Sequence, residues 1–225
     1  MILDSHTHLP APDAICSAEP QTLAQIAAEH PAQLLAAGIH PWSLAHLSPG
    51  EAQLRMNTLR HICATSPQVV AIGETGLDTL CGASPELQLD IFRQHIALAQ
   101  QLHLPLVLHV VRSAHLILAE LAAHRPTECT PWIWHGFRGK PELAAQFLAH
   151  PHTYISLGAL FNPATAAAID PARLLLETDA TSPESSPGIY EVARRVAAAT
   201  GLDSDELIRL TSANATAIFR AKQHF

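Results

Sequence analysis

Short apolar runs recur along the chain, and longer segments with helix-like patterning separate most of them. The runs are rich in Leu, Ile, Val and Ala and show little polar alternation, which is typical of parallel strands that are buried on both faces. We predict eight strands on this basis, at residues 2–4, 14–16, 34–37, 69–72, 106–108, 132–134, 154–157 and 174–176.

The intervening segments carry recognisable helix starts. Ser84 opens a long amphipathic run that reaches His103, and Asp203 opens the last helical segment. Strands that alternate with helices favour a parallel sheet, and eight such units in 225 residues predict a closed, slightly distorted (β/α)8 TIM barrel. We expect a single domain over residues 1–225. An open doubly wound sheet is the alternative, but no G-x-G-x-x-G motif follows the first strand.

Composition and charge narrow the class of protein. The chain contains no apolar run near the roughly 18 residues that cross a bilayer and no basic leader, so we expect a soluble, cytoplasmic protein without a membrane partner. The net charge of −7, with only two lysines, argues against an extended surface that reads nucleic acid. The four cysteines show no C-x-x-C spacing, which disfavours a structural zinc cluster.

Potential metal ligands follow the predicted strands at the ends where a barrel of this type carries its active site. Two histidines in the pattern His-x-His close the first strand, and on extended backbone both rings point to the same face. Imidazole and carboxylate groups are common ligands of divalent ions. Taken singly, each residue has a simpler explanation, because a histidine after a strand is more often a hydrogen-bonded loop residue and a carboxylate there often caps the next helix. Together they predict a metal centre of His6, His8, Glu74, His109, His135 and Asp179.

Further polar residues near the same strand ends are candidates for binding an anionic substrate: His40, Arg112, Arg138 and Lys140. The three cations are equally well explained as solvated surface residues. Trp42 offers a ring for stacking, although we expect it to pack beneath a loop. Asp78 either orients a ligand histidine or caps the following turn. The remaining histidines lie in or beside predicted helices, where we expect them to face solvent, among them His30, His61, His103, His124, His150, His152 and His224.

Six segments resemble, in order, the successive motifs of the TatD family of metal-dependent hydrolases. They span nearly the whole chain, and the fourth-strand and last-strand segments are the specific ones. The segments are Asp4-Ser5-His6-Thr7-His8, Gly38-Ile39-His40-Pro41, Ala71-Ile72-Gly73-Glu74-Thr75-Gly76-Leu77-Asp78, Leu104-Pro105-Leu106-Val107-Leu108-His109, His135-Gly136-Phe137-Arg138-Gly139 and Leu176-Glu177-Thr178-Asp179-Ala180.

The resemblance implies a barrel of the amidohydrolase superfamily with one or two metal ions and a nuclease or related phosphodiesterase activity. By this similarity one ion is held by His6, His8 and Asp179. The other is held by His109 and His135, and Glu74 lies between the two ions as a shared ligand. The loops that shape the substrate pocket are shorter than is usual for the family.

The predicted ligands suit hydrolysis by activated water. Two divalent ions about 3.5 to 4 Å apart stabilise both oxygens of an in-line displacement at phosphorus. Asp179 is either the proton acceptor as well as a ligand, or a ligand alone. The donor set suits Zn²⁺, Mn²⁺, Ni²⁺ or Fe²⁺ better than Mg²⁺. We expect a phosphodiester or small anionic substrate, with DNA as one candidate, and no protein partner is implied. An amide, ester or lactone hydrolase and a non-catalytic metal-binding protein are the alternatives.

Overall fold

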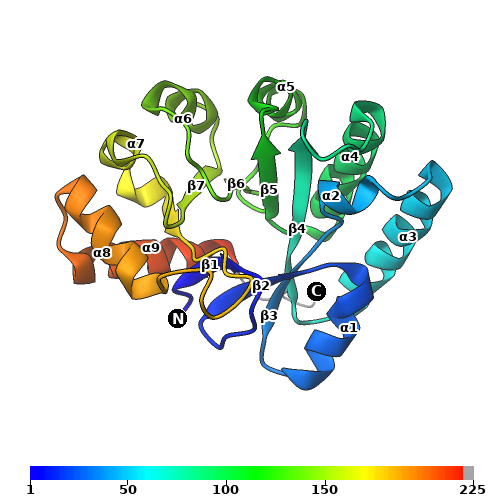
Figure 1. The fold of residues 1–225 in the computed structure, drawn as a ribbon, viewed down its shortest axis with the longest axis horizontal. Helices are drawn as coiled ribbons and strands as arrows, with labels where there is room; N and C mark the ends of the chain where they lie inside the picture. Colours follow the sequence, from blue (N-terminus) through cyan, green and yellow to red (C-terminus); the bar gives the residue numbers. More distant parts are fainter. Residues whose placement is uncertain (220–225) are drawn as a thin grey trace.

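The computed structural model describes residues 1–219, and its eight strands form a single parallel sheet in chain order (Figure 1). The strands are β1 (Asp4–Thr7), β2 (Ala14–Ala18), β3 (Leu34–Ala37), β4 (Val69–Asp78), β5 (Leu106–Val111), β6 (Trp132–Trp134), β7 (Thr153–Leu157) and β8 (Leu174–Leu176). Backbone hydrogen bonds from Asp179 N to His6 O and from His8 N to Ala180 O join the end of β1 to the segment after β8. The fold is therefore a (β/α)8 TIM barrel.

Helices surround the strands (Figure 1). They are α1 (Pro20–Glu29), α2 (Pro41–Leu44), α3 (Pro49–Thr65), α4 (Pro85–Leu102), α5 (Ala114–His124), α6 (Pro141–Leu148), α7 (Pro163–Ala168), α8 (Ile189–Thr200) and α9 (Ser204–Ile218), with a 3-10 turn at Pro171–Arg173. Ser84 caps α4 and Asp203 caps α9, which confirms both predicted helix starts. The regular alternation fails once, because a turn without a helix connects β1 to β2.

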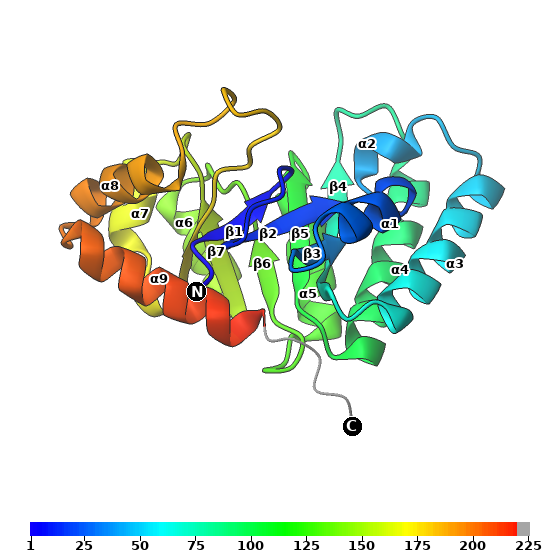
Figure 2. The same ribbon diagram turned by 90° about the horizontal axis from the view of Figure 1, so that it is seen from below.

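The barrel interior is filled by buried side chains from six strands: Ile15, Ala36, Val70, Ala71, Val107, Ile133 and Leu175. Ala215 of α9 and Phe219 just beyond it belong to the same cluster, so the last helix closes the base of the barrel. In Figure 2, α9 reaches this end, opposite the tips of the strand arrows. A packed interior of this kind leaves the opposite mouth as the place for a site.

All eight predicted strands exist, but five have different bounds: β2 ends two residues later, at Ala18, β7 begins one residue earlier, at Thr153, and the other three differ near the predicted site. The first strand begins at Asp4 and contains His6, the fourth continues to Asp78 past Glu74, and the fifth continues to Val111 past His109. The backbone of β4 keeps pairing with β5 to its end. Polar side chains therefore project into the mouth without ending the strands. No helix within residues 1–219 is long and apolar enough to cross a bilayer.

Candidate metal centre

Glu74 lies at the centre of the barrel mouth, and its two carboxylate oxygens face two different groups of histidines. Oε1 lies 2.7 Å from His109 Nδ1 and 2.6 Å from His135 Nε2. Oε2 lies 3.3 Å from His6 Nε2 and 3.6 Å from His8 Nε2. The side chain of Glu74 is 4% exposed, so this carboxylate is enclosed by imidazoles.

Asp179 completes the second group from the segment that follows β8. Its Oδ1 lies 3.8 Å from His6 Nε2 and 3.6 Å from His8 Nε2. The structure thus brings together all six residues of the predicted centre, from β1, β4, β5, the end of β6 and the segment after β8. Their role as ligands stays a prediction.

The chemistry of this donor set fits divalent ions. Both ring nitrogens of His6 are buried, and neither has a hydrogen-bond partner within residues 1–219. A buried polar atom without a partner costs free energy, and a cation bound by Nε2 beside Glu74 and Asp179 would remove that cost at Nε2. Three sets of donor atoms lie close enough to hold an ion: His6, His135 and Asp179; His6, His8 and Glu74; and His40, Glu74 and His109.

Two carboxylates lie behind the histidines that face Glu74 Oε1. Asp78 Oδ2 accepts from His109 Nε2 at 3.3 Å, which leaves Nδ1 of this ring turned toward Glu74. Glu177 Oε1 lies 3.5 Å from His135 Nδ1 and accepts from Gly136 N at 2.6 Å. The hydrogen bond from His109 to Asp78 is of the kind that fixes the tautomer and the orientation of a ligating imidazole. Glu177 lies near His135 Nδ1, but this nitrogen is buried and makes no hydrogen bond within residues 1–219. Of the two roles predicted for Asp78, the structure supports orientation of His109, and its Oδ1 also accepts from Leu80 N in the following turn.

The electrostatics of the centre favour bound positive charge. Burial alone would raise the pKa of Glu74, but His135, His109 and His40 lower this pKa well below its usual range. Burial alone would lower the pKa of His135, but Glu74 and Glu177 raise it well above the usual range. Burial likewise opposes ionisation of Asp179, but the hydrogen bond from His8 and the nearby rings of His135 and His6 together outweigh burial and lower the pKa of Asp179. Two ionised carboxylates in one enclosed site are stabilised by positive charge, which either a protonated His135 or a bound cation would supply.

His40 is predicted to bind substrate, and its ring lies in direct contact with Glu74 and His109 of the metal centre. Its Nδ1 accepts from Trp42 N at 3.1 Å, so the neutral ring carries its proton on Nε2. That Nε2 lies 3.2 Å from Glu74 Oε1 and 3.2 Å from His109 Nδ1. A ring protonated at Nε2 is suited to donate a hydrogen bond to a group bound at the centre.

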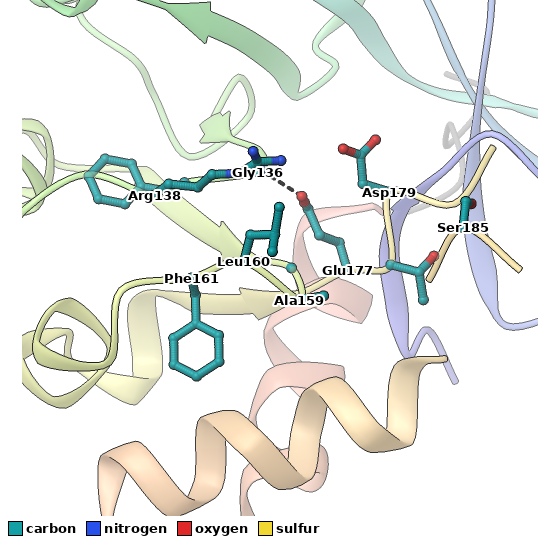
Figure 3. A pocket seen from close by; sticks show the side chains of 11 residues that line it. Gly136, Arg138, Ala159, Leu160, Phe161, Glu177, Asp179 and Ser185 are labelled. Atoms are coloured by element: carbon teal, nitrogen blue, oxygen red, sulfur yellow. Dashed lines mark hydrogen bonds between the residues drawn. The ribbon is translucent and has the colours of Figure 1, made fainter. Parts of the chain in front are cut away.

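The three cations predicted to bind substrate lie in different places. All are exposed. Asp179 lines two hollows, and one of these, shown in Figure 3, is lined by Arg138. This hollow is bounded by Leu160, Glu177 and Asp179, and Asp179 also lines the larger hollow that contains Glu74. Arg112 and Lys140 line neither of these two hollows, and their role in binding substrate stays a prediction.

Two expectations about single side chains are wrong. Trp42 does not pack beneath a loop: it is 61% exposed, because its indole N–H is held by Asp78 at the rim. His95, one of the helix histidines expected to face solvent, is fully buried, because its Nε2 accepts from Ile39 N and its Nδ1 contacts Ile91 O. Burial lowers the pKa of His95 to about 4. His224 lies outside the described residues.

Sequence reasoning missed two carboxylates of the site. Glu177 and Asp4 both lie in the segments that resemble the family's motifs, two residues before the predicted ligands Asp179 and His6. This spacing is the signal that could have identified them. Asp4 accepts from Thr178 N at 3.0 Å and from Thr178 Oγ1 at 2.5 Å, and thereby ties β1 to the segment that carries Asp179. Glu177 is fully buried.

Comparisons with known proteins agree with this geometry. A family model described as TatD related DNase matches residues 3–220. An uncharacterized metal-dependent hydrolase, YabD, of Bacillus subtilis (strain 168) is 31% identical over 170 residues, which cover 68% of this chain and 66% of the relative, just under two thirds of its length. A protein named 3'-5' ssDNA/RNA exonuclease TatD from Erwinia amylovora is 33% identical over 204 residues, covering 81% of this chain and 76% of the relative.

Solved structures show the same fold. The crystal structure of YJJV, a TatD homologue from Escherichia coli K12, superposes with a TM-score of 0.77 at 23% identity, covering 92% of this chain and 85% of that one. A TatD family hydrolase from Entamoeba histolytica also gives a TM-score of 0.77, at 18% identity, over 97% of this chain and 85% of that one. The match of the family model over nearly the whole chain shows that this protein belongs to the TatD-related DNase family.

Proposed function

We propose that this protein is a divalent-metal-dependent phosphodiesterase that removes nucleotides from single-stranded nucleic acid. The observation that carries the proposal is the position of Glu74 between two groups of histidines, at an open mouth that also exposes Asp179. The name of the Erwinia amylovora relative, an exonuclease on single-stranded DNA and RNA, supports this substrate class.

The two groups of residues would hold two ions. His6, His8 and Asp179 with Glu74 Oε2 would bind one, and His109 and His135 with Glu74 Oε1 would bind the other. Bound divalent ions activate a water molecule and neutralise charge on a phosphoryl oxygen. The nitrogen-rich donor set favours Zn²⁺, Mn²⁺, Ni²⁺ or Fe²⁺ over Mg²⁺.

Asp179 is the better placed of the two carboxylates to accept a proton from the attacking water. Its side chain is 35% exposed, whereas that of Glu74 is 4% exposed and is enclosed by imidazoles. A lowered pKa keeps Asp179 ionised at neutral pH and able to act as a general base. Glu74 serves as the shared ligand that fixes the distance between the two groups.

His40 and Arg138 contact the substrate in this proposal. The hydrogen bond from Trp42 N to Nδ1 keeps the proton of neutral His40 on Nε2, which faces Glu74 Oε1 at 3.2 Å. When Glu74 binds the ions, this proton would pass to a hydrogen bond with a phosphoryl oxygen or the leaving oxygen. Arg138 lines the neighbouring hollow, where its guanidinium can bind the next phosphate of the chain.

The test uses protein stripped with a chelator and reloaded separately with Mn²⁺, Zn²⁺ or Mg²⁺. Substrates are 5′-labelled single-stranded DNA and RNA, a blunt DNA duplex, and a panel of carboxylic esters, lactones and amides. We expect stepwise shortening of the single strands only after reloading. Asp179→Asn should lower kcat by at least about 100-fold, on the scale of lost general-base catalysis, while Asp90→Asn on the exposed face of α4 should match the wild type. Turnover of an ester or amide with none of nucleic acid would overturn the proposal.

A further inference from the structure

Trp42 is an exposed aromatic side chain at the edge of the metal centre. The chain has three tryptophans, and the other two, Trp132 and Trp134, are 2% and 5% exposed. Trp42 is 61% exposed and lines the same hollow as Glu74, His109 and Asp179. Exposure of so large an apolar ring beside a binding site suggests that a ligand covers it.

The ring is held in one position. Pro41 and the His40 cap start the short helix α2 that carries it, and Trp42 Nε1 donates to Asp78 Oδ2 at 2.7 Å. Its centroid lies 4.9 Å from that of His40 and 5.9 Å from that of His109. A flat group stacked on Trp42 would therefore lie directly beside a phosphate bound at the metal centre.

The charge of the surroundings distinguishes this side of the mouth from the opposite one. Within residues 1–219 no lysine or arginine lines the hollow of Trp42, and Glu19 and Ser43 form part of its wall. Arg138 lines the hollow on the other side of Asp179. The side of Trp42 therefore suits a flat, uncharged group, and the side of Arg138 suits the remaining phosphates.

We propose that Trp42 is the stacking platform for the base of the terminal nucleotide, which is the nucleotide released on hydrolysis. This inference rests on the proposed function and names where its substrate binds. Stacking on an aromatic side chain is tolerant of sequence, because every base presents a π-face. Truncation of such a platform lowers binding by about ten- to a hundredfold per base, and we expect a loss of this size in kcat/KM.

The experiment compares Trp42→Leu and Trp42→Phe on two oligonucleotides that differ only at the terminal residue, which carries a base in one and is abasic in the other. Trp42→Phe keeps a ring but loses the hydrogen bond to Asp78 Oδ2, whereas Trp42→Leu loses both. Tyr190→Ala is the control, because Tyr190 is also an exposed aromatic residue and lines neither hollow of the metal centre. Bound metal is quantified for every variant.

We expect Trp42→Leu to lose about ten- to a hundredfold in kcat/KM on the complete strand. Trp42→Phe should retain most of the activity, and the abasic strand should be cut equally slowly by all of these proteins. Two results would overturn the inference by showing that Trp42 acts through Asp78. One is an equal loss of kcat/KM on the complete and the abasic strand, and the other is an equal loss in Trp42→Leu and Trp42→Phe together with a reduced metal content. If the wild type distinguishes the two strands by less than threefold, stacking fails while the proposed function stands. If the wild type cuts neither strand, the proposed function itself fails.

Discussion

Gly38 controls the position of Glu74, and its replacement by alanine tests the metal centre without touching a ligand. Gly38 follows β3 and packs against the backbone of β4. A Cβ at this position would lie 2.5 Å from Glu74 O and 2.6 Å from Gly73 C. These are backbone atoms, which cannot rotate away as the end of a side chain can.

The expected displacement follows from these distances. Ordinary van der Waals contact begins near 3.4 Å, so the new methyl group falls about 0.9 Å short of it at Glu74 O. Overpacking of this kind costs about 1–3 kcal/mol of stability. A misplacement of about 1 Å in a catalytic group can cost on the order of 100-fold in rate. We therefore expect Gly38→Ala to bind Mn²⁺ or Zn²⁺ at least about tenfold more weakly and to lose about 100-fold in kcat.

The assay is isothermal titration calorimetry of chelator-stripped protein, combined with urea unfolding and circular dichroism to establish that the variant is folded. Gly50→Ala is the matched control, because no atom lies within 4 Å of a Cβ added there, in α3. Its metal affinity should equal that of the wild type. A folded Gly38→Ala protein with wild-type affinity and kcat would refute the argument that this close approach sets the position of Glu74.

Two further predictions concern residues that lie behind the site. Glu177→Gln should weaken metal binding by about 10- to 100-fold, because the negative charge 3.5 Å from His135 Nδ1 is lost. Unchanged affinity in a calorimetric titration would assign Glu177 to the hydrogen bond with Gly136 alone. The pKa of His95 is about 4 in the folded protein and 6.5 in the unfolded chain. Between these two pH values the unfolded chain binds more protons, so the free energy of unfolding decreases by about 3 kcal/mol as the pH falls from 6.5 to 4. His95→Gln keeps an acceptor for Ile39 N but cannot titrate, so its free energy of unfolding in urea should change by about 3 kcal/mol less between pH 7 and pH 4 than that of the wild type. An equal change in both proteins would contradict the lowered pKa of His95.

The sequence by itself determined the barrel and the set of residues at its mouth. Buried parallel strands carry short apolar runs, and eight such runs are visible without any structure. Because all strands of a parallel barrel end on one side, residues that follow those runs must meet there. This is why His6, Glu74 and Asp179, which are far apart in the chain, could be predicted to converge.

Only the tertiary structure decided what surrounds those residues. The exposure of a side chain depends on neighbours that are distant in sequence, so the exposed ring of Trp42 and the buried ring of His95 could not be read from their helical contexts. The position of Asp78 behind His109 depends on the pairing of β4 with β5. The position of Glu177 beside His135 depends on the barrel, which brings the segment after β8 to the end of β6 although β7 lies between these strands. The sequence therefore determined which groups reach the mouth, and the packing of the elements decided which nitrogen each ring turns toward Glu74.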